Sequence, residues 1–284
     1  MEITEFGNGV PRILLIPGGP GLVPAFYAEL TTQLAQNGRV ITYTPRGTAP
    51  RRPDDFPLTM EEAATELEDI IVGVKESQSG RGSMEAAPLV LLGHSFGSAV
   101  AIEYLTTRGI DALVDAAILV SPFSSGGMIR NGIGERVRDL PQVFHRRYKG
   151  GAIPPEELVP LLGEYWYPNY LCRAPWPQSF LDAMTRLNPA FMEHFIGENL
   201  LDLDGELLSW DRTADLTNVS VPTLIVSGSH DYFRREDLEL LRERIPRAEL
   251  VISETASHSI WLEDPETFYS ATDRLLATLS PDTP

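Results

Sequence analysis

The chain has 284 residues, of which 43% are hydrophobic and 22% charged, and 40 acidic against 23 basic residues give a formal net charge of −17 at pH 7. This length and composition are typical of one globular domain with a smaller insertion. An acidic surface repels nucleic acid and anionic membranes. We therefore expect neither as a partner, and a small molecule as the substrate.

We expect no targeting segment at the start of the given sequence. Met1–Glu5 is acidic, and neither the basic nor the apolar region of a signal peptide follows it. No apolar run approaches the roughly 20 residues that a membrane-spanning helix needs. The single cysteine, Cys172, rules out an internal disulfide and suits a reducing compartment. These features predict a cytoplasmic protein, whose oligomeric state the sequence leaves open.

Strand-like and helix-like segments alternate along the chain. After a short leading strand near Glu2–Phe6, apolar runs predict strands at residues 12–16, 39–43, 88–93, 115–121, 222–228 and 248–252. Helix-like patterns lie at residues 61–71, 98–108, 234–244 and 265–279, and a polar loop lies at residues 76–87. Such alternation predicts an α/β fold, a mostly parallel central sheet with helices on both faces.

The strand at residues 12–16 runs into a loop rich in glycine and proline, Pro17–Gly21. Alone, such a cluster indicates only a tight turn. Its place after an apolar strand, well ahead of the serine described next, fits a loop that supplies backbone N–H groups to an oxyanion. We expect the N–H group of Gly19 to be one donor of an oxyanion hole.

The strand at residues 88–93 leads into Gly93-His94-Ser95-Phe96-Gly97, a G-x-S-x-G pentapeptide, and a helical pattern follows. A strand that turns sharply into a helix is the nucleophile elbow, which holds its serine strained and exposed. The glycines let neighbouring backbones pass, and the helix N-terminus adds a positive dipole end. The sequence predicts Ser95 as the catalytic nucleophile and the Phe96 N–H group as the second oxyanion donor.

No strand-like run appears between Ser121 and Val221. This stretch has repeated prolines, short helical patterns and many aromatic residues. We expect a mostly helical cap at residues 122–213, inserted between the core segments 1–121 and 214–284. Most of its aromatic residues would form the cap's own core, and some would line an apolar pocket over Ser95.

The last two predicted strands carry the partners that a serine nucleophile needs. Asp231 follows the strand at residues 222–228, and His258 lies in the loop after the strand at residues 248–252. A serine hydroxyl is a weak nucleophile until a base takes its proton, and an acidic group must hold that base in one tautomer. The order serine, acid, histidine predicts Asp231 and His258 as the other catalytic residues.

The remaining histidines are expected to have other roles. His94 lies inside the elbow, and a structural or substrate-contact role is favoured; His145 and His194 fit a solvated surface, and His230 precedes the predicted acid. No pair of histidines has metal-ligand spacing with a carboxylate at a helical offset. We therefore expect no metal and no cofactor.

These motifs, their order and their spacing resemble the α/β-hydrolase superfamily and, within it, the proline iminopeptidase branch. Pro17–Gly21 is similar to the branch's His-Gly-Gly-Pro-Gly loop, with proline in place of the histidine. Residues 205–211 and 258–264 are similar to its return from cap to core and to its histidine loop. The resemblance implies an α/β-hydrolase fold with an inserted helical cap, and a hydrolase that forms an acyl-enzyme.

The sequence departs from the proline iminopeptidase pattern where that branch binds a substrate's free α-amino group. One carboxylate of the branch follows the triad acid directly, where this chain has Tyr232, and another lies in the cap, where our alignment places Leu200. Losing an anion that pairs with an ammonium group removes most of the preference for an N-terminal amine. Nearby acidic residues that could substitute are Glu198, Asp202 and Asp204.

Three functions remain open. The first is a serine hydrolase that acts on a small or medium ester, lactone or amide. The second is a proline iminopeptidase, an aminopeptidase that removes N-terminal proline. The third is a non-hydrolytic protein of the same fold, an acyltransferase, cyclisation catalyst or lyase, because a fold does not fix a function. For any of them we expect substrate contacts from Tyr232, Trp166 and Trp261.

Overall fold

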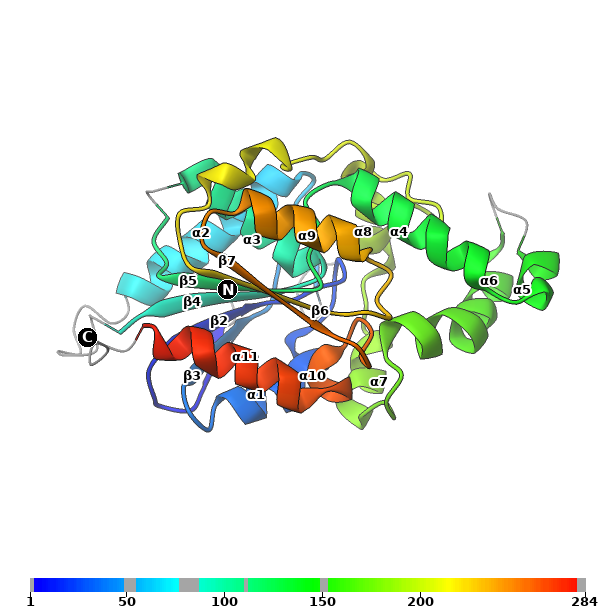
Figure 1. The fold of residues 1–284 in the computed structure, drawn as a ribbon. Helices are drawn as coiled ribbons and strands as arrows, with labels where there is room; N and C mark the ends of the chain where they lie inside the picture. The colour runs from blue at the N-terminus through cyan, green and yellow to red at the C-terminus, as the bar shows by residue number, and fades with distance from the viewer. Residues whose placement is uncertain (1–2, 49–54, 77–86, 110–111, 149–152, 280–284) are drawn as a thin grey trace.

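The structure is a computed structural model that describes residues 3–48, 55–76, 87–109, 112–148 and 153–279 (Figure 1). The polar loop predicted at residues 76–87 lies outside the described residues except for its two ends. The same holds for Glu2, the first residue of the predicted leading strand.

In the described part of the chain, seven strands form one sheet in the order β1-β3-β2-β4-β5-β6-β7. The strands are β1 (Ile3–Phe6), β2 (Arg12–Ile16), β3 (Arg39–Tyr43), β4 (Leu89–His94), β5 (Ala116–Val120), β6 (Thr223–Gly228) and β7 (Ala248–Ser253). The edge strand β1 pairs with β3 in antiparallel orientation, and all other neighbours are parallel. The predicted α/β fold with a mostly parallel sheet is confirmed.

Burial explains why the central strands are continuous apolar runs. Every residue of β2, β3, β4, β5 and β6 is buried, because helices cover both faces of the sheet. Figure 1 shows helices on one side and the other of these strands. On one face lie α2 (Met60–Glu76), α3 (Phe96–Arg108) and α9 (Arg235–Arg244); on the other lie α1 (Ala28–Leu34), α10 (Ile260–Glu263) and α11 (Pro265–Ala277).

Helix α2 is longer than the segment expected at residues 61–71. Its buried side chains recur at helical spacing from Met60 to Val74, so the face that packs on the sheet continues past Ile71. Glu61 and Glu62 lie in its first turn, where their negative charges interact favourably with the positive end of the helix dipole. The sequence pattern identified the helix, but the predicted segment ended at Ile71, before the last buried residue of its apolar face, Val74.

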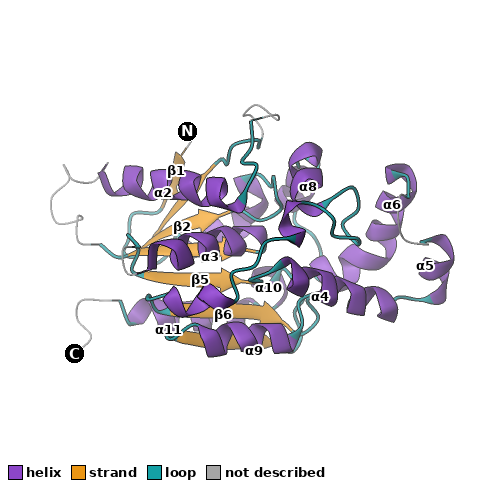
Figure 2. Ribbon diagram, turned by 90° about the horizontal axis from the view of Figure 1, so that it is seen from above, coloured by secondary structure: helices purple, strands orange, loops and turns teal. Residues whose placement is uncertain are grey.

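Residues 122–213, which we call the cap segment, lie between β5 and β6. The described helices of this segment are α4 (Gly126–Asp139), α5 (Gln142–Arg147), α6 (Pro155–Leu161), the π-helix η4 (Leu162–Leu171), α7 (Gln178–Met184), α8 (Pro189–Ile196) and the short 3₁₀ helix η5 (Glu206–Leu208). Figure 2 shows α4, α5 and α6 extending beyond the carboxyl ends of the strands. Large aromatic side chains of the segment are buried, among them Phe144, Trp166, Phe180, Phe191 and Phe195.

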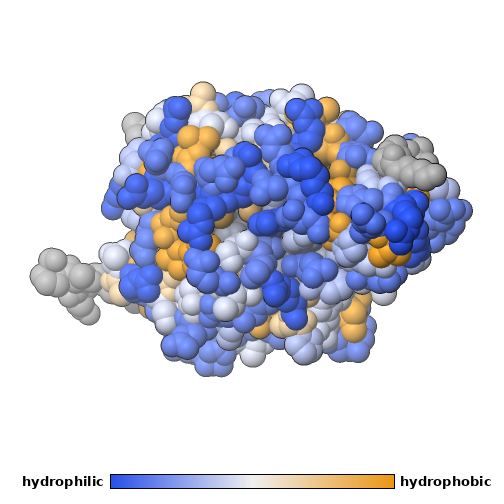
Figure 3. All heavy atoms as spheres, turned by 45° about the vertical axis from the view of Figure 1, so that its right-hand side comes forward, coloured by the Kyte–Doolittle hydropathy of each residue, from blue (hydrophilic) through white to orange (hydrophobic). Residues whose placement is uncertain are grey.

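The face of the molecule in Figure 3 is mostly hydrophilic, with small and separate hydrophobic patches. Exposed apolar residues are scattered over several elements, which is ordinary for a protein surface. No helix within the described ranges is long and apolar enough to cross a membrane.

Candidate active site

Ser95 lies at a strained turn between β4 and α3. Its backbone has φ 53° and ψ −118°, a left-handed conformation that is rare for a residue with a side chain. The flanking glycines are required by close approach: a Cβ at Gly93 would lie 2.5 Å from the carbonyl oxygen of Gly97, and one at Gly97 would overlap that of Ile16. The G-x-S-x-G pattern therefore forms the strand-turn-helix elbow that the sequence predicts.

His258 and Asp231 come together from the loops after β7 and β6. The His258 Nδ1 atom lies 3.0 Å and 3.1 Å from the two carboxylate oxygens of Asp231. Both side chains are buried, with 2% and 0% of their surface exposed. Because a carboxylate can only accept a hydrogen bond, the ring proton of His258 lies on Nδ1. The other nitrogen, Nε2, is then free of a proton and can act as an acceptor or a base.

Asp231 is held in its ionised form. Burial by itself raises the pKa of this carboxyl group, but the charge of His258 and the hydrogen bond from it bring the pKa below its usual value. Ser227 Oγ, at the end of β6, donates to Asp231 Oδ2 at 3.0 Å, and the N–H group of Phe233 donates to Oδ1 at 3.3 Å. The carboxylate thus has enough donors to remain charged in a buried site.

Tyr232 contacts the other side of the His258 ring. Its hydroxyl lies 2.9 Å from His258 Nε2, and the two rings lie 4.5 Å apart between centroids. Burial and the neighbouring Asp231 charge raise the pKa of this phenol well above its usual value. The hydroxyl of Tyr232 therefore lies at the ring nitrogen of His258 that does not contact Asp231.

The Pro17–Gly21 loop passes beside the elbow. Gly19 has φ +113° and lines the same cavity as Ser95, and a Cβ there would lie 2.8 Å from the backbone nitrogen of Gly21. Among the described residues, no acceptor is bonded to the N–H groups of Gly19 and Phe96. Phe96 N–H opens helix α3, directly after Ser95. That these two N–H groups form an oxyanion hole stays a prediction.

A hydrogen-bond chain connects this loop with the histidine loop. The N–H group of Gly18 donates to the Tyr27 hydroxyl at 2.7 Å, and that hydroxyl lies 2.9 Å from His94 Nδ1. His94 Nε2 lies 3.1 Å from the carbonyl oxygen of His258 and donates to it. Burial, with the charge of His258, lowers the pKa of His94 well below its usual value, so this ring stays neutral. His94 is a structural residue at the centre of the site.

Two residues of the cap segment hold the backbone of the site. Arg136, on α4, donates to the carbonyl oxygens of Asp231 at 2.8 Å and of Ser229 at 3.1 Å. The carbonyl oxygen of Tyr170, on η4, accepts a hydrogen bond from the N–H group of His258 at 3.3 Å. The positions of Asp231 and His258 therefore depend on the cap segment as well as on the sheet.

A cavity of about 80 Å³ lies beside Ser95 and His258. Trp166 and Tyr232, two of the three predicted substrate contacts, line it. The third, Trp261, is not among the lining residues: it is buried behind His94, with ring centroids 4.8 Å apart. The rest of the lining is mainly apolar and includes Leu22, Phe26, Leu171, Met184, Leu187 and Met192.

No acidic side chain is among the described residues that line this cavity. Leu200, at the position of a family carboxylate, lines it as an apolar residue. Of the acidic residues near it in sequence, Asp202 accepts hydrogen bonds from Tyr148 at 2.7 Å and from Asn199 at 3.2 Å. Neither Glu198 nor Asp204 lines the cavity. The site as described offers no anion to an ammonium group.

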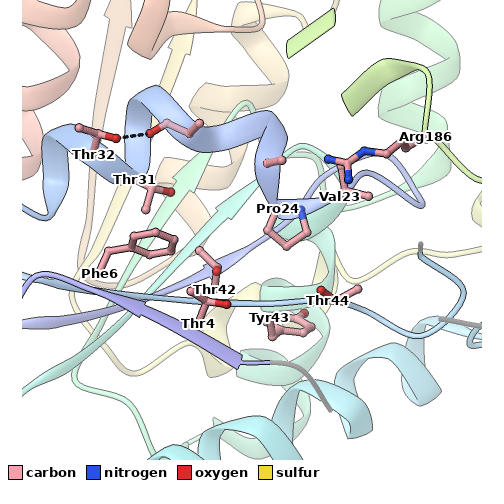
Figure 4. Close-up of a pocket in the computed structure, with 12 residues that line it drawn as sticks. Thr4, Phe6, Val23, Pro24, Thr31, Thr32, Thr42, Tyr43, Thr44 and Arg186 are labelled. Atoms are coloured by element: carbon pink, nitrogen blue, oxygen red, sulfur yellow. Dashed lines mark hydrogen bonds between the residues drawn. The ribbon is translucent and has the colours of Figure 1, made fainter. Parts of the chain in front are cut away.

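A larger hollow of about 470 Å³ lies elsewhere, between β1, β3 and the segment formed by η1 (Pro24–Tyr27) and α1 (Figure 4). Five threonines line it, Thr4, Thr31, Thr32, Thr42 and Thr44, and Arg186 lies at one end. The described lining includes no carboxylate, histidine or cysteine that could act as a base or nucleophile. The smaller cavity at Ser95 is therefore the candidate active site.

The other histidines lie away from Ser95 or in supporting positions. His194 Nε2 bonds the carbonyl oxygen of Leu58 at 2.8 Å, and His230 is partly buried next to the acid. Within the residues that the structure describes, no group of three or more histidine, cysteine or acidic side chains is arranged to hold a metal ion.

Sequence reasoning did not single out Tyr27, Ser227 or Arg136. Ser227 could have been noticed, because it lies next to the end of the strand that leads to Asp231. Tyr27 and Arg136 carry no local signal, since each reaches the site through contacts between distant segments.

The alpha/beta hydrolase family model matches residues 13–271 of the chain. Curated proteins similar to it include a proline iminopeptidase of Chitinophaga pinensis, 22% identical over 274 residues, which cover 92% of this chain and 88% of that protein. Another is a proline iminopeptidase of Saccharolobus solfataricus, 26% identical over 269 residues, which cover 89% of this chain and 80% of that protein.

Solved structures show the same fold. The crystal structure of proline iminopeptidase from Mycobacterium smegmatis superposes with a TM-score of 0.81 at 20% identity, over 98% of this chain and 94% of that one. The crystal structure of VinJ superposes with a TM-score of 0.84 at 21% identity, over 98% of this chain and 95% of that one. At these identities the likeness concerns the fold alone.

Proposed function

Because the chain belongs to the alpha/beta hydrolase family, we propose that it is a serine hydrolase in which Ser95 attacks a carbonyl carbon and forms an acyl-enzyme. The observation that carries the proposal is the strained Ser95 beside a buried His258–Asp231 pair. A strained serine has a structural cost of about 1–3 kcal/mol, which a purely structural turn would avoid.

In this mechanism each group has one role. His258 takes the proton of Ser95 and later gives it to the leaving group, while Asp231 holds the ring and stabilises its charged form. The N–H groups of Gly19 and Phe96 donate to the oxyanion, where the positive end of the α3 dipole adds to their effect. Water then releases the acyl group by the same route.

The cavity favours a short, uncharged acyl group. Its volume of about 80 Å³ is well below the roughly 300 Å³ at the lower end of pockets for drug-sized ligands. Its lining is apolar apart from the reacting groups, so a charged acyl group would lose its hydration without finding a partner. We therefore propose a short-chain ester, lactone or amide as the substrate class.

Proline iminopeptidase activity is the second candidate, and the names of the curated relatives favour it. Its substrate carries a free ammonium group beside the scissile carbonyl. The apolar Leu200 in the cavity lining and Tyr232 beside the triad acid place no carboxylate where such a group would bind. For this reason we rank it below the ester, lactone or amide substrates.

A comparison of initial rates separates the two candidates. L-prolyl and L-alanyl p-nitroanilides are compared with p-nitrophenyl acetate and butyrate, with Ser95→Ala as the blank. We expect turnover of the esters and little turnover of the free-amine anilides. Faster cleavage of the anilides would favour the peptidase, and no cleavage of either class above the blank would contradict a serine hydrolase.

A further inference from the structure

Glu263 reaches back from the end of helix α10 to the loop that carries His258. Its Oε2 atom accepts a hydrogen bond from the N–H group of Ser257 at 3.0 Å, and its Oε1 atom accepts one from the N–H group of Ser259 at 3.2 Å. The Ser257 hydroxyl is a third donor, at 2.8 Å from Oε1 and 3.0 Å from Oε2. One carboxylate therefore holds the main chain on both sides of His258.

The peptide groups of His258 itself are bonded to other elements. Its N–H group donates to the carbonyl oxygen of Tyr170 at 3.3 Å. Its carbonyl oxygen accepts from His94 Nε2 at 3.1 Å and from Ser121 Oγ at 3.3 Å. Because Glu263 accepts from the N–H groups before and after it, three consecutive N–H groups of the loop have acceptors. The main chain cannot shift here without leaving one of these groups unpaired.

The position of Glu263 requires two accepting oxygens, since a backbone N–H group meets each of them. A carboxylate can only accept hydrogen bonds, and bonds from N–H groups to a charged oxygen are stronger than those to a neutral one. An amide at this position would accept from one N–H group and present its own NH₂ group to the other. The carboxylate form of Glu263 therefore allows a single side chain to hold both groups.

Helix α10 gives this carboxylate a fixed base. Ile260 and Trp261 are buried, with 0% and 2% of their surface exposed. The residue after Glu263 is Asp264, whose side chain accepts a hydrogen bond of 2.7 Å from Ser253 Oγ, at the end of β7. The Asp264 side chain also caps the N-terminus of helix α11. These contacts connect Glu263 to the sheet and to α11, and thereby fix the place from which it holds the loop.

We propose that Glu263 is a positioning residue that keeps the imidazole of His258 bonded to Asp231 and within reach of Ser95. It does not line the cavity at Ser95, so it acts through the main chain of the loop and not by contact with the substrate. Fixed geometry matters here, because proton transfer is effective only within hydrogen-bond reach. The inference rests on the proposed serine hydrolase function, in which His258 takes the proton directly from Ser95.

The test is Glu263→Gln, which keeps the size of the side chain and removes its charge and one of its two accepting oxygens. Glu266→Gln is the matched control, because Glu266 is an exposed acid in the first turn of α11. We expect Glu263→Gln to lower kcat for p-nitrophenyl acetate about 10- to 100-fold, as when a catalytic group is displaced by up to about 1 Å. KM should change little, because His258 acts both in forming and in releasing the acyl-enzyme. Glu266→Gln should match the wild type.

Proton NMR gives a signature that a general loss of stability would not produce. The Nδ1–H proton of His258, in its hydrogen bond to the buried Asp231, should resonate downfield of the amide protons, and its absence from His258→Gln assigns it. We expect this resonance in the wild type and in Glu266→Gln. In Glu263→Gln it should be lost through exchange with water, while the rest of the spectrum remains that of a folded protein.

A second variant, Glu263→Asp, serves if Glu263→Gln folds poorly. It keeps the charge but shortens the side chain by one methylene group, so the carboxylate no longer reaches both N–H groups. We expect a weaker resonance and a smaller decrease of kcat in the same direction. An unchanged resonance in either folded variant, or a change confined to KM, would overturn the positioning role of Glu263.

Because the resonance is measured without substrate, it separates failure of this inference from failure of the proposed function. If the wild type cleaves esters and the Glu263 variants match it in kcat and in the resonance, only the role of Glu263 is wrong. If the wild type cleaves no ester and a fluorophosphonate probe leaves Ser95 unmodified, the proposed function is wrong. The resonance then still decides whether Glu263 holds the imidazole of His258 in place.

Discussion

The hydroxyl of Tyr27 lies 2.9 Å from His94 Nδ1, and this contact joins the oxyanion loop to the histidine loop. Gly18 N–H donates to the same hydroxyl, and His94 bonds the carbonyl oxygen of His258 from its other nitrogen. Because all these groups are buried, none can exchange its partner for water without cost. Tyr27 and His94 thus fix two parts of the site relative to each other.

We expect Tyr27→Phe to destabilise the protein by about 1–3 kcal/mol, because it leaves the Gly18 N–H group and His94 Nδ1 buried without a partner. Turnover should fall as well, since the oxyanion loop loses its support. Urea unfolding and ester turnover measure the two effects. Tyr269→Phe is the control, because Tyr269 lies on α11, outside the site. Equal losses of stability and turnover in Tyr27→Phe and Tyr269→Phe would show that the Tyr27 hydroxyl does not support the oxyanion loop.

His94 makes stability depend on pH in a defined direction. Its pKa in the folded state lies well below the 6.5 of an exposed imidazole, so the unfolded chain binds a proton that the folded one excludes. The contribution of His94 to stability is therefore complete above about pH 6.5 and decreases as the pH falls, by at most about 1.4 kcal/mol per pH unit. His94→Gln should lose less stability than the wild type between pH 8 and pH 5.5 in urea titrations. A loss of equal size in both proteins would show that His94 does not titrate in this way.

Arg136 should affect catalysis more than stability. Arg136→Met removes the donors that hold the carbonyl oxygens of Asp231 and Ser229. A displacement of the acid by about 1 Å can lower turnover by about 100-fold. We expect a reduced kcat with KM nearly unchanged, whereas Arg138→Met, an exposed residue on the same helix, should match the wild type. A change confined to KM would argue against a positioning role.

The buried Glu103 is balanced by Arg212, which makes two hydrogen bonds of 2.6 Å to its carboxylate. Glu103 is 1% exposed and also accepts from the Trp210 indole at 2.8 Å. Arg212→Met leaves this buried charge without its cation. Because Arg212 is itself 31% exposed, water can partly replace it, and we expect a cost of about 2–3 kcal/mol, below the roughly 3–5 kcal/mol of a fully buried pair. The exposed pair of Arg274 and Glu249 is the control, where Arg274→Met should cost less than about 1 kcal/mol. Similar unfolding free energies for the two variants would contradict this difference.

The sequence allowed the sheet and the positions of Ser95, Asp231 and His258 to be predicted, because each depends on a local pattern. Buried parallel strands are continuous apolar runs, and the groups at their carboxyl ends meet at one edge of the sheet. That the three residues act together as a catalytic triad remains our proposal.

Contacts between distant segments could not be predicted in this way. Trp261 has the same residue type as Trp166, yet it packs behind His94 while Trp166 lines the cavity. The contact of Tyr232 with His258 depends on the turn after β6, which no spacing rule describes. The apolar character of the cavity likewise depends on which side chains of the cap segment turn inward.

The most direct test of the account is to trap the acyl-enzyme. The protein is mixed with p-nitrophenyl butyrate, quenched in acid within the first turnovers, and analysed by intact mass and peptide mapping. We predict one butyryl group on the peptide that contains Ser95, and none in Ser95→Ala. A butyryl group on another residue, or equal labelling of the Ser95→Ala variant, would contradict the proposal that Ser95 is the nucleophile.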